Sequence, residues 1–350
     1  MSEPRLRTKL KILTLGLLVP VLTVFATYEF LVTHLDFAMF GLAKLRSTYL
    51  RDLNDQRVGR DYPPVDLVVL GDSTAKVGFN PTEIHSIFAV NLAVHGGTNV
   101  VSYATLTEYL KTHPAPRCVF LLSQENWHRN YGMFFSKVIF QNYLSWDEIR
   151  SIWQTGAANH IFPASEMSWF EYHTRSLLAL LELNPPPLAQ LQEALKLGSM
   201  NAERRSDVAR FTAQRGWHAR EDSETMQRKF FDPHMHEMYV NRFTASASED
   251  FYLHRIVELG RARGFRVLFG SSPMAESFYV RSSERFQHDR DSHLQKILQD
   301  EPALVYLPLP RVFPQQLHSD LNHLNAEGAR VFARELEPQL KSYCRPPDAT

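Results

Sequence analysis

Five short apolar runs, separated by segments that carry helix signals, are the feature that most constrains how this 350-residue chain can fold. Each run has the length of a buried strand, and consecutive parallel strands need a crossover between them that is usually a helix. The alternation therefore predicts an α/β fold of three layers, with a five-stranded parallel sheet between two layers of helices. The runs are residues 65–70, 88–93, 118–122, 265–269 and 304–307.

Expected helix starts are marked by polar residues whose side chains can accept a hydrogen bond from the first helical turn. The first of them, Asn80, is followed by a proline at the first helical position, where proline is well tolerated. The other candidates are Thr98 or Asn99, Ser246 and Asn325. The last helix, after Asn325, would close over the sheet.

A cluster of small and polar residues, Gly71-Asp72-Ser73, follows the first apolar run directly. The small residues let the backbone turn sharply at the end of the strand and present the Ser73 hydroxyl to solvent. The carboxyl ends of parallel strands form the ligand crevice of an open α/β sheet, so a nucleophile is expected here. A plain strand-to-helix turn is the alternative, since three-residue motifs recur by chance.

Asp320 and His323 lie three residues apart, just before the last expected helix. This spacing places both side chains on one side of a single helical turn. Asp320 would accept the Nδ1 proton of His323, which leaves Nε2 free to take the proton of Ser73. A helix-entry cap is the alternative role for Asp320. Together the two motifs predict an esterase-type site with Ser73 as nucleophile, His323 as base and Asp320 as the residue that orients the base.

With these motifs the chain resembles the SGNH (GDSL-type) hydrolase superfamily, whose members carry a Gly-Asp-Ser block like the one ending at Ser73 and finish with Asp-x-x-His. The run from Asp320 to Asn325, followed by Gly328, looks like the cell-envelope branch, which includes membrane-anchored proteins of polysaccharide and teichoic-acid acylation. The resemblance implies a flavodoxin-like SGNH fold and a covalent acyl-enzyme. Serine chemistry alone does not choose between an ester hydrolase and an O-acyltransferase. A non-catalytic, glycan-binding scaffold of envelope polysaccharide assembly is the alternative function.

The resemblance also implies an oxyanion hole built from the serine's own N–H, a glycine after the second strand and an asparagine after the third. In this chain these residues are Ser73, Gly96 and Asn126, with Gly97 as the alternative to Gly96. The third block reads Ser-Gln-Glu-Asn and so departs from the family's Gly-x-Asn-Asp pattern. Trp127 follows directly and is a candidate substrate-binding residue, because aromatic faces stack on sugar rings.

An apolar stretch near the N-terminus, residues 12–32, is long enough to cross a bilayer. Basic residues at positions 5, 7, 9 and 11 precede it, which predicts that residues 1–11 stay in the cytoplasm. The stretch is therefore expected to be an uncleaved, single-pass signal anchor. A cleaved signal peptide is less favoured because no Ala-x-Ala site follows. Residues 33–64 would form a juxtamembrane helix and linker, and the catalytic domain would lie in the periplasm or at the cell surface.

The remaining chain is expected to be one SGNH hydrolase-like domain, residues 65–343, followed by a tail at 344–350. Residues 131–244 are too many for a single crossover and are expected to form a helical lid insertion. Tryptophans gather in and just before this segment, which suits either a carbohydrate cleft or the small core that a lid needs. The second interpretation is favoured, because amphipathic helices routinely pack with tryptophan.

Charge and composition exclude several kinds of partner. The 38 lysines and arginines are balanced by 38 aspartates and glutamates, so nothing attracts nucleic acid at long range. Neither a cofactor nor a metal is expected, since glycine-rich phosphate loops are missing and His234 and His236 lack further ligands at zinc spacings. The spacing of Cys118 and Cys344 indicates no metal or redox site and leaves a disulfide undecided. The expected partners are an acylated glycan or another envelope ester, the membrane, and other envelope-biosynthesis proteins.

Overall fold

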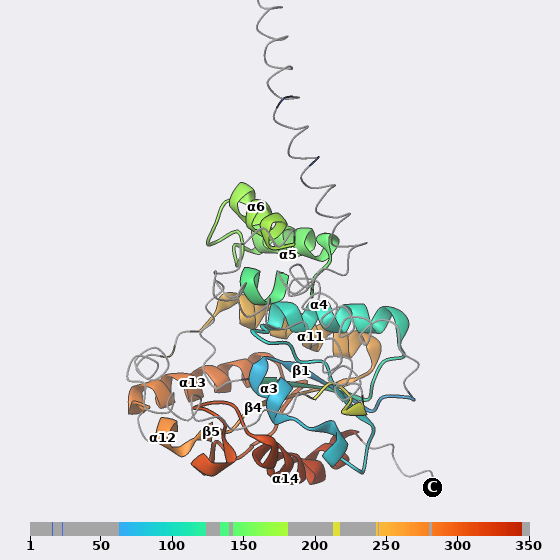
Figure 1. The fold of residues 1–350 in the computed structure, drawn as a ribbon, viewed down its shortest axis with the longest axis vertical. Helices are drawn as coiled ribbons and strands as arrows, with labels where there is room; N and C mark the ends of the chain where they lie inside the picture. The colour runs from blue at the N-terminus through green and yellow to red at the C-terminus, as the bar shows by residue number, and fades with distance from the viewer. Residues whose placement is uncertain are drawn as a thin grey trace, which may run out of the picture. The chain divides into compact units, whose positions relative to one another are not determined.

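The computed structural model gives the helices and strands of the sheet-forming part of the chain (Figure 1). The chain divides into two units, and Gly16 and Thr23 are the residues of the first unit that the structure describes. All other described residues belong to the second unit, which holds the sheet. These residues are 63–123, 134–139, 143–180, 213–217, 243, 245–279 and 282–344.

Parallel strands form the main sheet, in the order β2-β1-β3-β4-β6. Each strand overlaps one of the predicted apolar runs, so the prediction of a five-stranded parallel sheet is confirmed. The chain reverses its direction of progress across the sheet between β1 and β3, and in this flavodoxin-like order the ligand crevice lies at that point. The strands are β1 (Leu67–Gly71), β2 (Ala89–Asn91), β3 (Cys118–Ser123), β4 (Arg266–Ser271) and β6 (Leu304–Tyr306).

Helices cover both faces of the sheet, because strand side chains alternate between two apolar clusters. In β1, Leu67 and Val69 join a cluster that includes residues of α3 and α14. Val68 and Leu70 join the opposite cluster, which includes residues of α4, α11 and α13. Figure 1 shows α4 and α11 on one side of the sheet and α14 on the other, which is the predicted three-layer arrangement. The helices are α3 (Ser73–Gly78), α4 (Asn99–Thr112), α11 (Ala247–Arg263), α13 (Glu284–Asp300) and α14 (Ala326–Cys344).

A helical segment starts at each of the predicted positions, with its cap bond formed. Thr98, Ser246 and Asn325 each accept an N–H from the first turn of α4, α11 and α14 respectively. The start predicted at Asn80 is confirmed, since its side chain accepts the N–H of Thr82, but the helix that follows is only the 3₁₀ turn η1 (Pro81–Glu83). A helix, α3, has already begun directly after β1, so this segment need only carry the chain to β2.

A disulfide joins Cys118 to Cys344 and ties β3 to the end of α14. The two Cα atoms are 5.5 Å apart, although the residues are separated by 226 positions in the sequence. The structure thus decides a question that the sequence left open. A cross-link that closes so long a loop restricts the unfolded chain and stabilises the fold.

The described parts of the expected lid insertion include three helical segments. Tyr172 is fully buried there, and its ring packs against that of Trp153 with centroids 5.4 Å apart. Trp146 and Trp169, by contrast, are 38% and 59% exposed, so in α5 and α6 the structure agrees with the favoured interpretation of the tryptophans only at Trp153. The elements are η2 (Phe134–Ile139), α5 (Trp146–Asn159) and α6 (Trp169–Leu180).

Residues 213–217, inside the insertion, contact the sheet and α3. The Arg215 carbonyl accepts the N–H of Asn91, in the outermost strand β2, at 2.9 Å. Trp217 is buried, and its indole N–H donates to the Val77 carbonyl of α3 at 2.6 Å. The insertion therefore contacts both β2 and the helix that begins at the predicted nucleophile.

The predicted membrane anchor, residues 12–32, lies outside the described residues except for Gly16 and Thr23. The linker that was expected to follow is likewise outside them up to residue 62. Within the part of the chain that the structure describes, no helix combines the length and apolar character needed to span a bilayer. The anchor and the location that it implies stay predictions.

Candidate active site

Ser73 is the first residue of α3 and follows β1 after a tight turn. The turn requires glycine at position 71, where φ is +145° and a Cβ would lie 1.8 Å from the carbonyl oxygen of Leu122. Asp72 caps α3, and its Oδ1 accepts the N–H of Thr74 at 2.8 Å. The Ser73 N–H lies in the first helical turn, where backbone N–H groups have no partner within the helix.

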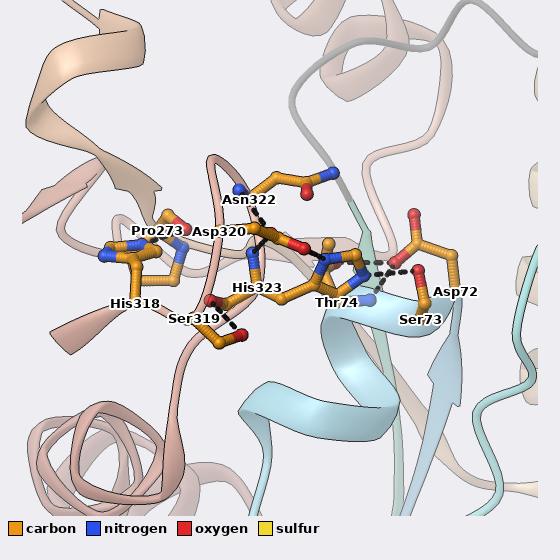
Figure 2. Close-up of polar contacts among 9 residues, drawn as sticks. All are labelled: Asp72, Ser73, Thr74, Pro273, His318, Ser319, Asp320, Asn322 and His323. Carbon is orange, nitrogen blue, oxygen red and sulfur yellow. Dashed lines mark hydrogen bonds and ion pairs between the residues drawn. The ribbon is translucent and has the colours of Figure 1, made fainter. Parts of the chain in front are cut away.

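The structure brings Ser73, His323 and Asp320 together across 250 positions of sequence, as Figure 2 shows. Nε2 of His323 lies 2.8 Å from Oγ of Ser73. On the other side of the ring, Nδ1 lies 2.8 Å from Oδ1 and 3.0 Å from Oδ2 of Asp320. The side chains of His323 and Asp320 are only 15% and 10% exposed, so little water competes for these contacts.

The segment that carries Asp320 and His323 is a loop and not the single helical turn that their spacing predicted. Oδ1 of Asp320 accepts the backbone N–H groups of Asn322 at 3.1 Å and of His323 at 2.9 Å. A short acidic side chain that binds nearby N–H groups in this way competes with helix formation. The loop is closed by Ser319, whose N–H donates to the His323 carbonyl at 2.9 Å. Asn325, and not Asp320, then caps the helix that follows.

The segment after β2 carries Gly96 and packs against the turn before Ser73. The N–H of Val94 donates to the Gly71 carbonyl at 3.1 Å. A Cβ at position 97 would lie 2.3 Å from that same carbonyl oxygen, so Gly97 permits the close approach. The N–H of Gly97 donates to Val94, which makes Gly96 the better of the two candidates for an oxyanion donor. Gly96 itself has φ of +71°.

Asn126 and Trp127, the remaining predicted site residues, lie outside the described residues. The strand that leads to them, β3, pairs with both β1 and β4 and ends at Ser123. Its carboxyl end thus lies beside that of β1, which leads to Ser73. The chain between β3 and residue 126 starts on the correct edge of the sheet for the role that the resemblance implies.

Lys76 is a residue near the nucleophile that sequence reasoning missed. Its side chain is buried, and Nζ donates to the Ala93 carbonyl at 3.0 Å. Burial lowers the pKa of Lys76 to about 7. The missed signal was the Ser-x-x-Lys spacing from Ser73, which in some acyl-transfer enzymes places a lysine beside the serine. Here the contact to the serine hydroxyl comes from His323.

His318 is a second buried histidine close to the pair formed by Asp320 and His323. Its Nδ1 lies 3.3 Å from the Pro314 carbonyl and its Nε2 lies 3.3 Å from the Pro273 carbonyl. Burial lowers the pKa of His318, which favours the neutral ring. His318 thus links the loop that carries Asp320 and His323 to the segment after β4, and the role of its imidazole is structural.

Metal ligands do not gather anywhere in the described part of the chain. Among those residues, no group of three or more histidines, cysteines, aspartates or glutamates could hold an ion. His234 and His236 lie outside the described residues. The described site is therefore assembled from a serine, a histidine, a carboxylate and backbone N–H groups.

Comparisons with known proteins give a limited likeness. No protein-family model and no curated protein matches the chain. The chain is similar to a provisionally named platelet activating factor structure from Streptococcus pneumonia, with a TM-score of 0.37 and 12% identity, over 91% of this chain and 99% of that one. It is also similar to a provisionally named acylhydrolase from Bacteroides fragilis NCTC 9343, with a TM-score of 0.33 and 9% identity, over 84% and 95% respectively.

Proposed function

We propose that the protein is a serine esterase or O-acyltransferase of the SGNH type that acts through Ser73, His323 and Asp320. The observation that carries the proposal is the linear array of contacts from Ser73 Oγ to His323 Nε2 and from His323 Nδ1 to Asp320. A histidine held in this way can take a proton from the serine while the carboxylate stabilises the imidazolium that forms. The array joins residues far apart in the sequence, which supports a chemical role over a local turn.

The reaction begins when Ser73 Oγ attacks the carbonyl carbon of an ester and its proton passes to Nε2 of His323. The negative charge that develops on the carbonyl oxygen is stabilised by the N–H groups of Ser73 and Gly96, with Asn126 as a third donor. The tetrahedral intermediate collapses, the alkoxide leaves with the proton from His323, and an acyl-enzyme forms. Water or a glycan hydroxyl then attacks the acyl-enzyme, and His323 removes the proton of that acceptor. The bond between the acyl carbon and Ser73 Oγ breaks, His323 returns the proton to Oγ, and the acid or the acylated glycan is released.

The proposed substrate is an acylated polysaccharide or another ester of the cell envelope. Support comes from the apolar stretch at residues 12–32 with basic residues before it, which is typical of a signal anchor. The Cys118–Cys344 disulfide adds to this, because such bonds persist chiefly in exported proteins. Trp127, directly after the third expected block, is the candidate for stacking on a sugar ring.

A fluorophosphonate probe tests the catalytic proposal directly, because it reacts covalently with an activated serine. Mass spectrometry is expected to find the label on Ser73 in the native wild-type protein and to find none in His323→Ala. Ser342→Ala, which alters an exposed serine on α14, serves as the matched control and is expected to label normally. Absence of labelling in the folded wild type would contradict the proposal and favour the non-catalytic scaffold.

A second experiment separates the two fates of the acyl-enzyme. The purified protein is given an acetyl ester donor with and without candidate envelope glycans, and both free acetate and acetylated glycan are measured. A transferase produces acetylated glycan at the expense of free acetate. Acetate release that no glycan alters would count against a transferase and leave the hydrolase.

A further inference from the structure

Lys76 carries a charged group into a part of the fold where an apolar side chain would be less costly. Only 2% of the residue is exposed, and it lies one helical turn after Ser73 in α3. Burying an ammonium group is unfavourable unless it gains strong hydrogen bonds. Its Nζ donates to the Ala93 carbonyl across 17 positions of sequence. A buried donor with so specific a target indicates a role in fixing that target.

Ala93 stands at the start of the segment that carries Gly96, and both its backbone groups are held. Its carbonyl accepts from Lys76 at 3.0 Å, and its N–H donates to Oδ1 of Asn91 at 3.0 Å. The amide of Asn91 in turn donates to the carbonyl of Ala75, within α3, at 2.9 Å and to that of Phe79, which follows α3, at 2.8 Å. The side chains of Lys76 and Asn91 thus join α3, which begins with Ser73, to the start of the loop that carries Gly96.

We propose that Lys76 is a positioning residue for acyl transfer, which fixes the Ala93 carbonyl and so holds the Gly96 N–H toward the oxyanion formed at Ser73. The inference rests on the proposed function. A displacement of about 1 Å in such a donor can cost roughly a hundredfold in rate, so a rigid attachment has a clear chemical value. Lys76 does not take the place of the base, because Ser73 Oγ is in contact with His323.

The kinetic test compares Lys76→Met with the wild type on a soluble acetyl ester. Methionine keeps an unbranched apolar chain and removes the N–H donor. The expected result is a fall in kcat of about a hundredfold with KM changed by less than about twofold, because the oxyanion contact develops in the transition state. Lys76→Gln, which retains a donor on a shorter chain, is expected to recover part of kcat and also serves if the methionine variant does not fold.

The matched control is Lys111→Met, which removes the same group from the exposed side of α4, where Lys111 is 61% exposed and pairs with Glu108. Its kcat is expected to equal that of the wild type. Fluorophosphonate labelling of Ser73 is expected to be slower in Lys76→Met but still present. Complete loss of labelling, as in His323→Ala, would overturn the positioning role in favour of a lysine base.

Amide hydrogen exchange gives a readout that does not depend on turnover. In Lys76→Met, exchange at Val94 and Gly97 is expected to be about tenfold faster, because their hydrogen bonds to Gly71 and Val94 define the loop. Unchanged exchange, or an equal increase in β1 as well as in the loop, would overturn the inference. If the fluorophosphonate does not label Ser73 in the folded wild type, the proposed function fails, while exchange still decides whether Lys76 holds the loop.

Discussion

The two halves of the candidate site are held in place in different ways. Asp320 and His323 belong to a loop whose hydrogen bonds lie largely within residues 316–325. The turn at Ser73 and the loop at Gly96 are held instead by contacts between β1, α3 and the segment after β2. The histidine loop is bonded mainly within itself, so it is expected to tolerate changes in the rest of the fold. The nucleophile half is made of separate segments, so its geometry depends on the position of each segment.

The difference teaches which substitutions will affect chemistry alone and which will also affect the fold. In the histidine loop, one oxygen of Asp320 serves both the backbone and the imidazole. In the nucleophile half, the residues that hold the backbone are different from the residue that reacts. In each half, the effect of a substitution on activity can therefore be measured separately from its effect on stability.

The largest expected effect is that of Asp320→Asn. The amide oxygen can still accept the N–H groups of Asn322 and His323, so the free energy of unfolding changes little. The loss of the carboxylate removes control of the His323 tautomer, and kcat is expected to fall on the order of 10⁴-fold. Asp320→Ala, measured beside it in urea, is expected to lose about 1–3 kcal/mol of stability as well, because two buried N–H groups lose their acceptor. A kcat within threefold of wild type in Asp320→Asn would show that the loop needs no carboxylate.

Gly97→Ala is expected to have the next largest effect and tests the nucleophile half. Its new Cβ would lie 2.3 Å from the Gly71 carbonyl oxygen, so the loop and the turn must separate. The expected loss of kcat is about a hundredfold. Gly264→Ala is the matched control, because that glycine has φ of +78° but no atom within 4 Å of a Cβ. It is expected to cost about 1 kcal/mol of stability and no activity. Equal kcat in both variants would contradict the close packing.

The third prediction compares how the stability of Lys76→Met and of the wild type depends on pH, and it tests the burial of Lys76 in the nucleophile half. The pKa of Lys76 is lowered from 10.5 to about 7 in the folded protein. Between these values the unfolded chain keeps a proton that the folded protein has released, so the stability of the wild type rises with pH in that window. Relative to Lys76→Met, the wild type is expected to gain roughly 1 kcal/mol per pH unit from about pH 7 to about pH 10. Urea unfolding at several pH values measures this, with Lys111→Met as control, and parallel curves would contradict it.

Asn325→Ala has the smallest expected effect. The substitution removes the cap bond to the N–H of Gly328, 2.8 Å, and the bond to the Gln316 carbonyl, 2.8 Å. A loss of about 1 kcal/mol in the free energy of unfolding is expected. Because the histidine loop is bonded mainly within itself, kcat is expected to stay within about threefold of wild type. A fall in kcat as large as that of Gly97→Ala would show that the two halves are equally fragile.

The parts of the fold that depend on local signals could be predicted from the sequence. The strands follow from apolar runs, and the caps at Thr98, Ser246 and Asn325 follow from side chains that bond within one helical turn. The Asp320–His323 pairing belongs to the same category, although the backbone between them is a loop. The helix expected after Asn80 is only one 3₁₀ turn, because the sequence around it does not show that α3 has already begun.

The rest of the site could not be predicted because it depends on distances between segments. The Ser-x-x-Lys spacing places Lys76 near Ser73 but does not show that the lysine is buried, and its partner Ala93 is an ordinary residue after a strand. Likewise the closeness of Gly97 to the turn at Gly71 is a property of packed backbone. Such contacts can be recognised only when the positions of β1, α3 and the segment after β2 are known.

The strand β2 lies at one end of the sheet, where its outer backbone groups would otherwise be open to pairing. Arg215 occupies part of that edge by accepting the N–H of Asn91, and Gly216 allows the approach, since a Cβ there would lie 2.0 Å from the Asn91 carbonyl oxygen. Exposed edge strands are templates for association with other chains. Residues 215 and 216 of the insertion therefore cover part of this edge and are expected to disfavour its pairing with other chains, a task independent of any substrate.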